Sequence, residues 1–438
     1  MGESLRTIGL INALIKIAVY SVNDIFYMLI IKTLDNDVKS TLCINFIAVV
    51  KIFSSICTSY SVEKYYNHKK MLALGCFLFG SSLLMFPIIQ LSSLFKGNLT
   101  KIIGCCILVS IYYVALGIIF SVVDSLSINW LRHNSSIKNF SVIKQYSSFG
   151  HLIAYLPNFF VGRKGLIPSL KNYDENLISS IYGVFFAFLS CFVVLKYCPE
   201  YEKTYQDEKI VDTTENKDKK AKKVLFKSAF NPYFTLFCLI ILLAGVQRFS
   251  FTFLQRYLLE KEKNIKGLQA AAMQMCRIVF EILFYSALKK FFKKKKHYEM
   301  IFCSAIFLCA VKPIFFKLGL KTQNKIVSNI ILYSTDISKG FFTCLFGISH
   351  PLICHDIASK GYKSFSMGIY NGLYNGGSTV VFSIFSLIFL IGKDSSTIVE
   401  DSSRILLGII ILTILNFMIT VCFCRSIYKK KMKLRYKN

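Results

Sequence analysis

Two lysine-rich breaks decide how this chain folds: EKYYNHKK at residues 63–70 and KKFFKKKKH at residues 289–297. Each break follows two long apolar segments of the chain and precedes four more. The second break lies about 226 residues after the first, which is about half of the 438-residue chain. This spacing indicates a duplicated six-helix unit in a membrane, and an internal duplication of this kind is typical of transporters.

The composition around the breaks supports membrane helices. The chain is 54% hydrophobic and 15% aromatic, which is too apolar for a soluble domain of this size. Apolar stretches of about 20 residues recur, and each is long enough to cross a bilayer as a helix. We therefore predict twelve membrane helices, with both termini on one side. The expected spans are 8–32, 41–61, 71–93, 102–129, 143–162, 177–196, 231–258, 268–288, 299–317, 326–353, 365–391 and 404–424.

The predicted architecture is an all-α integral membrane protein of two pseudo-symmetric six-helix bundles, at residues 1–198 and 230–425. A polar stretch of dense mixed charge at 199–229 is the expected cytoplasmic linker, and 426–438 is expected to be a basic cytoplasmic tail. Weak matches between the halves repeat the spacing of the breaks. Pro87 and Pro313 lie about 226 residues apart, as do Gly150 and Gly376.

The net charge of +29 is explained by a basic membrane surface rather than by nucleic acid. More than half of the 53 Lys and Arg residues fall in the predicted segments on the side of the termini. The positive-inside rule then makes that side cytoplasmic, and we expect the plasma membrane as the location. The 15 cysteines are scattered without a Cys-x-x-Cys pair, so no metal, cofactor or disulfide is expected.

Charged residues inside the predicted helices are the candidates for function, because each one costs at least about 2.5–3.5 kcal/mol in hydrocarbon. Two pairs share a helix face, Arg277 with Glu281 and Asp336 with Lys339, and could simply stabilise packing. The basic members are Lys16, Lys51, Lys144, Arg248, Arg277, Lys312 and Lys339, and the acidic ones are Asp24, Asp124, Glu281 and Asp336.

A cavity-lining role is favoured for Asp124, Lys144 and Lys312, which have no charged neighbour in the sequence. Because an apolar cavity favours the protonated form of a carboxyl group, Glu281 and Asp124 are the candidates for proton coupling. Basic groups outnumber acidic ones in the helices, which favours anionic or polyhydroxylated substrates.

At these residues the chain resembles the major facilitator superfamily, and within it the lactose permease-like and nucleoside–proton symporter branch. The resemblance is carried by Asp124 and the run KQYSSFG at 144–150. The branch shows an acidic residue late in helix 4, then a pattern close to Arg-x-[Trp/Phe]-Gly-[Ser/Cys]-x-Gly. The resemblance implies that Lys144 replaces a substrate-contacting arginine and His151 an aromatic residue that stacks on sugar. Both departures argue against a disaccharide.

In the second half, the resemblance implies that Glu281 occupies an acidic position tied to substrate affinity and proton coupling. Lys312 resembles the arginine of helix 9, and Lys339 stands where the family has a histidine before glycine. Glu63 and Lys64 keep the charges of the superfamily's loop motif between helices 2 and 3, and they are the expected cytoplasmic gate.

Other polar residues could line the same cavity, or could equally hydrogen-bond between helices. These are Asn23, Gln247, Asn371 and Asn375, from helices that border the central cavity in the superfamily.

The favoured hypothesis is a monomeric secondary-active transporter that works by alternating access. Nucleosides or nucleotides are the first substrate candidates, with sugars and organic anions next and a proton as the coupling ion. A membrane enzyme is one alternative, for which His350, His355 and Asp356 would be the candidate site. A substrate sensor or scaffold of the same fold that no longer transports is another.

Overall fold

The computed structural model is helical throughout the part of the chain that it describes, and those residues form no strand. This confirms the predicted all-α class. The described residues are 2–23, 26, 30, 46–65, 67–91, 98–134, 137–157, 175–199, 231–263, 265, 268–292, 298–358, 363–390 and 395–435.

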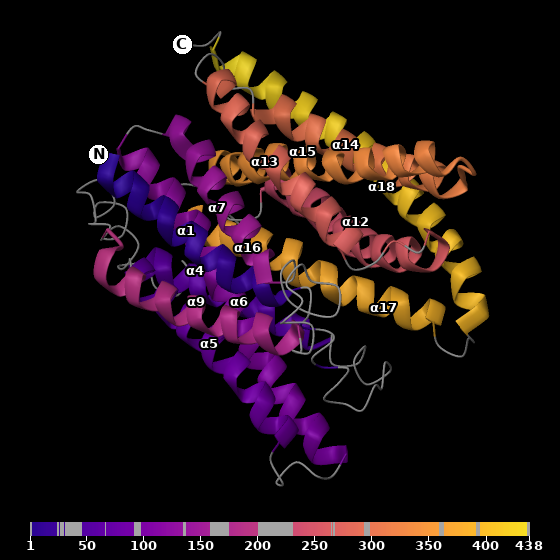
Figure 1. Cartoon of the computed structure of the whole chain (residues 1–438). Coiled ribbons are helices and arrows are strands. Elements are labelled where there is room, and N and C mark those ends of the chain that lie inside the picture. Colours follow the sequence, from indigo (N-terminus) through magenta and orange to yellow (C-terminus); the bar gives the residue numbers. More distant parts are fainter. Residues whose placement is uncertain are drawn as a thin grey trace.

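The first half is a bundle of helices, coloured indigo to magenta in Figure 1. Its helices are α1 (Gly2–Asn23), α4 (Val49–Tyr65), α5 (His68–Leu91), α6 (Asn98–His133), α7 (Phe140–Ala154) and α9 (Glu175–Tyr197). The first lysine-rich break lies where α4 ends at Tyr65 and α5 begins at His68, at the predicted boundary between two helices.

The second half repeats this arrangement in the part of Figure 1 coloured from rose through orange to yellow. Its helices are α12 (Pro232–Lys263), α13 (Leu268–Phe292), α14 (Tyr298–Lys321), α15 (Lys325–Ile357), α16 (Lys363–Gly372), α17 (Ser378–Leu390) and α18 (Ser395–Arg435). A π-helical turn, η5 (Leu373–Gly377), joins α16 to α17, so the helix expected at 365–391 carries a local bulge. α18 continues to Arg435, into the predicted tail, whereas the predicted linker lies almost wholly outside the described residues.

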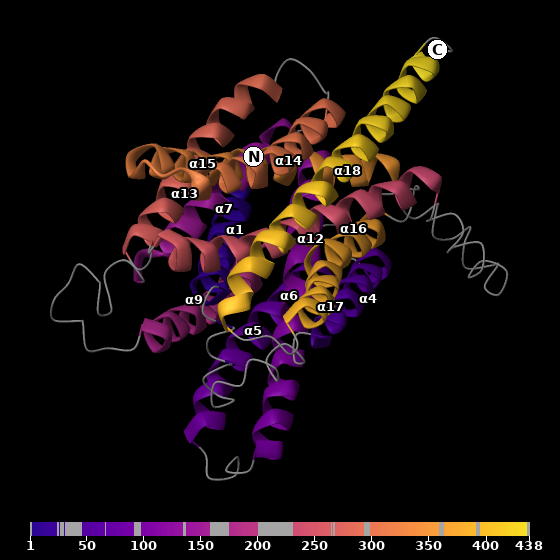
Figure 2. The ribbon, with the colours of Figure 1, turned by 90° about the vertical axis from the view of Figure 1, so that its right-hand side faces the viewer.

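The two halves lie side by side, and the N- and C-terminal ends of the chain are at the same end of the molecule (Figures 1 and 2). We call this the terminal end. Direct packing between halves occurs mainly where α4 meets α16 and where α7 meets α13. These contacts bring charged side chains of both halves together.

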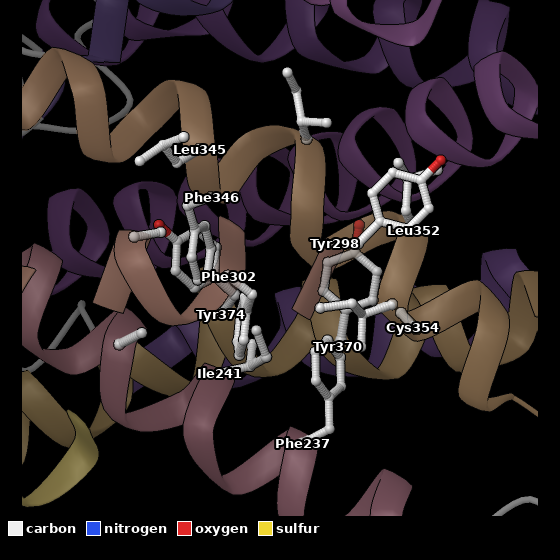
Figure 3. Packing of buried hydrophobic residues seen from close by; sticks show 14 of the residues in the cluster. Phe237, Ile241, Tyr298, Phe302, Leu345, Phe346, Leu352, Cys354, Tyr370 and Tyr374 are labelled. Carbon is white, nitrogen blue, oxygen red and sulfur yellow. The ribbon is translucent and has the colours of Figure 1, made fainter. Parts of the chain in front are cut away.

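Two large apolar clusters form the core: one lies within the first half, and the other is centred on the second half but also includes residues of the first, such as Trp130 and Phe140. In the first half, Phe26 stacks on Tyr112 with ring centroids 3.7 Å apart. In the second, the Phe302 ring centroid lies 5.8 Å from that of Phe237 and 5.8 Å from that of Phe346. Figure 3 labels these three residues within the cluster. Aromatic packing of this kind stabilises a helix bundle without help from water, which a bilayer lacks.

The outer surface of the bundle is apolar, as a lipid-facing surface must be. Large side chains such as Phe53, Phe185 and Met418 are well exposed on it. Among the described helices, seven are long and apolar enough to span a membrane: α1, α6, α9, α12, α14, α15 and α18. α4 and α7 are shorter, at 17 and 15 residues, and α13 carries the buried charges Arg277 and Glu281.

Two glycines allow the close helix approaches that frame the site. A Cβ at Gly368 of α16 would lie 2.6 Å from the Ser55 carbonyl oxygen of α4, so only glycine permits this contact between halves. Gly150 lies against the Ala13 backbone in the same way, which brings α7 against α1.

Candidate functional site

An ion pair joins α6 to α7 within the first half. The Lys144 ammonium lies 2.6 Å from an Asp124 carboxylate oxygen, and both side chains are largely buried, with 13% and 15% exposed. The Lys144 ammonium also lies 5.2 Å from the centroid of the Phe140 ring. Each member therefore neutralises the other, although twenty residues separate them in sequence.

Glu281 lies at the contact between the two halves. Its side chain is 4% exposed, and the Ser148 hydroxyl donates to its carboxylate at 2.5 Å. Ser148 belongs to α7 and Glu281 to α13, so this bond crosses between the halves. Arg277, Lys16 and Lys144 lie within electrostatic range of the same carboxylate. A second bond between these helices, from the Gln145 amide to the Ser286 hydroxyl at 2.6 Å, is exposed.

His151 lies one helical turn beyond Ser148 and is stacked on an aromatic ring of the protein. Its ring centroid is 3.8 Å from that of Tyr20 on α1, and Tyr155 lies at 5.3 Å. Its Nε2 atom is buried without a hydrogen-bond partner in the described part of the chain. The histidine is thus held in place by Tyr20, with one polar atom still unused.

Lys16 and Lys51 approach a single aromatic ring from two helices. The ammonium nitrogens of Lys16, on α1, and Lys51, on α4, lie 4.8 Å and 5.3 Å from the centroid of Phe120. Lys16 also lies 5.1 Å from the Tyr20 ring, and Lys51 lies 5.9 Å from the Tyr113 ring. Among the described residues, neither lysine contacts a carboxylate, so rings take the place of counter-ions.

Arg248 contacts the π-helical turn of the second half. Its guanidinium carbon lies 4.1 Å from the centroid of Tyr374, and its Nη2 atom donates to the Asn375 amide oxygen at 3.1 Å. Turns of this kind are frequent at functional sites because they redirect side chains within a helix. Here η5 directs both Tyr374 and Asn375 toward Arg248.

Lys312 borders a small cavity of about 30 Å³ between α12, α14 and α15. Its ammonium lies 3.7 Å from the Phe251 ring centroid, and Lys339 is part of the same wall. Gln247 also borders the cavity and donates to the Cys309 carbonyl at 2.8 Å. This volume holds roughly two water molecules.

The remaining acidic and amide candidates lie at different places in the bundle, each with its own surroundings. Asp336 accepts a hydrogen bond from the Gln255 amide at 3.1 Å. Asn371 of α16 donates to the Phe120 carbonyl of α6 at 3.2 Å, which is another bond between the halves. Asn23 is the last residue of α1, and its side chain and Asp24 lie outside the described part of the chain.

Bonds between the halves hold the terminal end together, and Glu63 makes two of them. Its carboxylate accepts from the backbone amides of Ser364 at 2.5 Å and Phe365 at 3.2 Å, at the start of α16. Arg132 of α6 and Asp356 of α15 form an ion pair at 2.8 Å. Lys64 is exposed, and its ammonium lies 5.2 Å from the ring of the adjacent Tyr65.

The residues of the enzyme alternative do not converge on a catalytic arrangement. His350 stacks on Phe346 with ring centroids 4.3 Å apart, and its Nδ1 atom lies against the Phe346 carbonyl. Asp356 is paired with Arg132. Within the described residues there is no group of three or more His, Cys, Asp or Glu side chains that could hold a metal ion.

A multi-pass helical membrane protein, with charges of two six-helix halves gathered between them, has the architecture of a membrane transporter. The sequence matches the model of the MFS_1 like family over residues 29–399. The chain therefore belongs to this family, which confirms the resemblance to the major facilitator superfamily. No curated protein sequence shows significant similarity to the chain.

Solved transporter structures share the fold over nearly the whole chain. The nucleoside transporter NupG has a TM-score of 0.64 at 14% identity, covering 96% of this chain and 99% of that chain. The E. coli fucose:proton symporter FucP has the same TM-score and identity, covering 96% and 98%. A bacterial homologue of the iron transporter ferroportin, in an outward-facing state, has a TM-score of 0.69 at 7% identity, covering 96% and 99%.

Several residues of the site escaped the sequence analysis. Ser148 belongs to the run at residues 144–150, but nothing in the sequence indicated that it would contact Glu281. The rings of Phe120 and Tyr20 gave no signal, because aromatic residues are common throughout the chain. Arg132 and Asp356 lie near helix ends, where charges are expected in any membrane protein.

Proposed function

We propose that this protein is a secondary-active transporter that moves a small polar solute by alternating access. Nucleosides or nucleotides are the favoured substrates, followed by sugars and organic anions. The bond between Ser148 and Glu281 carries the proposal, because it links a buried carboxylate of one half to a hydroxyl of the other. A buried ionisable group at a moving interface is suited to couple proton binding to the motion.

The substrate site is proposed to lie between the halves, at Asp124, Lys144, His151, Lys312, Lys339, Asn23, Asn371 and Asn375. In support, the Lys144–Asp124 pair and the stacked His151 lie on helices that also contact the second half. Asn371 and Asn375 come from the helix that packs against α4. A solute would exchange its water shell for these groups as the halves close around it.

Proton coupling is proposed for Glu281, with Asp124 as its partner in charge balance. When the halves separate along α7 and α13, the Glu281 oxygen loses the Ser148 hydroxyl. A proton on the carboxyl group then removes the charge that would otherwise be left without a partner. Rebinding of Ser148 favours release of that proton, so the cycle links proton movement to the motion of the halves.

The orientation and the gate follow from the charge pattern. We place the termini in the cytoplasm because the basic segments lie on that side, and we propose the plasma membrane as the location. Glu63 and Lys64 would then belong to the cytoplasmic gate, in which Glu63 bonds to the start of α16.

Uptake by purified protein in proteoliposomes tests this function. Labelled nucleosides, nucleotides and sugars are offered at two external pH values, with and without a pH gradient. We expect the pH gradient to drive accumulation of the labelled substrate. Uptake should fall about tenfold or more in Glu281→Gln and in Lys144→Ala. Ser286→Ala is the matched control, since it removes an exposed bond between the same two helices and should leave uptake unchanged.

Unchanged transport by both Glu281→Gln and Lys144→Ala would contradict the site assignment. Substrate binding without uptake by the unaltered protein would instead identify a sensor or scaffold of the same fold.

A further inference from the structure

Three cations between the halves share a region in which none of them contacts a carboxylate among the described residues. They are Lys16 of α1, Lys51 of α4 and Arg248 of α12. Lys16 and Lys51 lie over the same ring, that of Phe120. The Lys51 side chain is only 7% exposed, and its ammonium lies over the rings of Tyr113 and Phe120, which carry no net charge.

Arg248 belongs to the same region although it comes from the other half. Its partners Tyr374 and Asn375 lie in η5. This turn packs on the part of α4 that holds Lys51: a Cβ at Gly376 would lie 2.8 Å from the Ile52 side chain and 3.2 Å from the Ala48 carbonyl oxygen. Lys51 is accordingly within electrostatic range of both Arg248 and Lys16.

The neighbouring carboxylates are bonded to other residues. Asp124 is within electrostatic range of Lys16 but is bonded to Lys144 at 2.6 Å. Glu281 is also near Lys16 and is bonded to Ser148. Since charges within a membrane protein are matched by partners or by ligands, three cations that face rings favour the binding of an anionic ligand.

We propose that Lys16, Lys51 and Arg248 bind the phosphate group of a phosphorylated solute. A phosphate monoester carries close to two negative charges at neutral pH, which suits three cations better than a single carboxylate does. The arginine fork matches two phosphate oxygens, while each lysine acts as a point charge. The site takes one cation from each of three helices, and it closes only when both halves contribute.

This inference rests on the proposed function for its substrate, because it selects nucleotides over nucleosides within the favoured class. It does not depend on transport, since binding alone reveals the site. In the transport cycle, the phosphate would draw α12 of one half toward α1 and α4 of the other.

Ligand-induced thermal stabilisation and equilibrium binding of the purified full chain test the proposal. The probes are a nucleoside, its 5′-monophosphate, inorganic phosphate and a dicarboxylate of similar size. We expect the monophosphate to bind at least about tenfold more tightly than the nucleoside, and inorganic phosphate to bind measurably. Lys51→Gln and Arg248→Gln should each weaken monophosphate binding about tenfold or more, and Lys51→Gln should leave the weak nucleoside binding unchanged.

Lys196→Gln is the matched control, because Lys196 also lies over aromatic rings, at 5.7 Å and 5.3 Å, but is exposed on α9. It should bind the monophosphate as the unaltered protein does. Equal affinity for nucleoside and monophosphate, equal affinity for the dicarboxylate, or no binding of any phosphorylated probe would each overturn the proposal.

Transport separates this inference from the proposed function. Monophosphate binding that requires Lys51, without uptake in proteoliposomes, supports the phosphate site and contradicts the transport function. Monophosphate uptake that is indifferent to Lys51→Gln supports transport and contradicts the phosphate site.

Discussion

Lys144 and Lys51 are both lysines of the first half, both lie within the membrane bundle, and they have opposite surroundings. The Lys144 ammonium lies 2.6 Å from Asp124, whereas the Lys51 ammonium lies 5.3 Å from a phenylalanine ring centroid and 5.9 Å from a tyrosine ring centroid. A buried lysine with a counter-ion contributes to the stability of the fold. A buried lysine over rings lowers stability until an anion arrives, which is what a binding residue must do.

The largest expected effect comes from breaking the pair. In Asp124→Asn, Lys144 keeps its charge without a partner, so the free energy of unfolding should fall by about 3–5 kcal/mol. Thermal unfolding of the purified protein in detergent measures this loss. The double variant Asp124→Asn with Lys144→Gln should recover most of it, because no unmatched charge remains.

Strictly additive losses in that double variant would contradict the comparison. Such a result would mean that Asp124 and Lys144 contribute independently and that the short distance between them has no energetic weight.

The opposite sign is expected at the ring-facing lysine. Lys51→Met removes a charge that costs about 2.5–3.5 kcal/mol in hydrocarbon, and it gives up cation–π contacts of about 0.5–1 kcal/mol. We therefore expect Lys51→Met to raise the free energy of unfolding by about 2 kcal/mol. The same thermal measurement reports it in the absence of any ligand.

Lys196→Met is the control for Lys51→Met, since it removes an exposed lysine that also lies over rings. Its effect should stay within about 0.5 kcal/mol. A lower stability for Lys51→Met than for the unaltered protein would show that Lys51 is a structural residue.

The sequence predicted the fold well because hydrophobic length and the spacing of breaks are properties of the chain alone. The turn formed by Glu63 to Lys70 and the repeated arrangement of helices follow from where lysines interrupt apolar segments. Membrane helices must satisfy their own backbone hydrogen bonds, so the number of helices can be predicted without knowledge of how they pack. The π-helical bulge at Leu373–Gly377 was not predicted, since it depends on packing against α12 and α4.

The site was predicted less completely because partners across helices depend on rotation about each helix axis. Asp124 and Lys144 were each selected, yet their pairing was not foreseen, since twenty residues and a turn separate them. The spacing in the sequence predicted Arg277 as the neighbour of Glu281, and the structure adds Ser148 from the other half. Charges are visible in a sequence, but the rings or hydroxyls that face them are not.

The smallest expected effects lie at the terminal end, where the same contrast recurs in a milder form. Glu63 bonds to two backbone amides of α16, whereas Arg132 and Asp356 form a pair whose side chains are 35% and 33% exposed. Glu63→Gln replaces charge-assisted hydrogen bonds by neutral ones. It should destabilise the contact between the halves at this end by about 1 kcal/mol. Asp356→Asn should cost about 0.5 kcal/mol or less, because water already screens that pair.

Hydrogen exchange at the amides of Ser364 and Phe365 distinguishes the two variants, because both amides are protected only while Glu63 holds them. A cost of about 1 kcal/mol corresponds to exchange about fivefold faster in Glu63→Gln. Asp356→Asn should change the same rates by less than about twofold. Faster exchange in Asp356→Asn than in Glu63→Gln would mean that the exposed ion pair closes this end. The burial of a charged group would then not determine its contribution to stability, either at the gate or at Lys144 and Lys51.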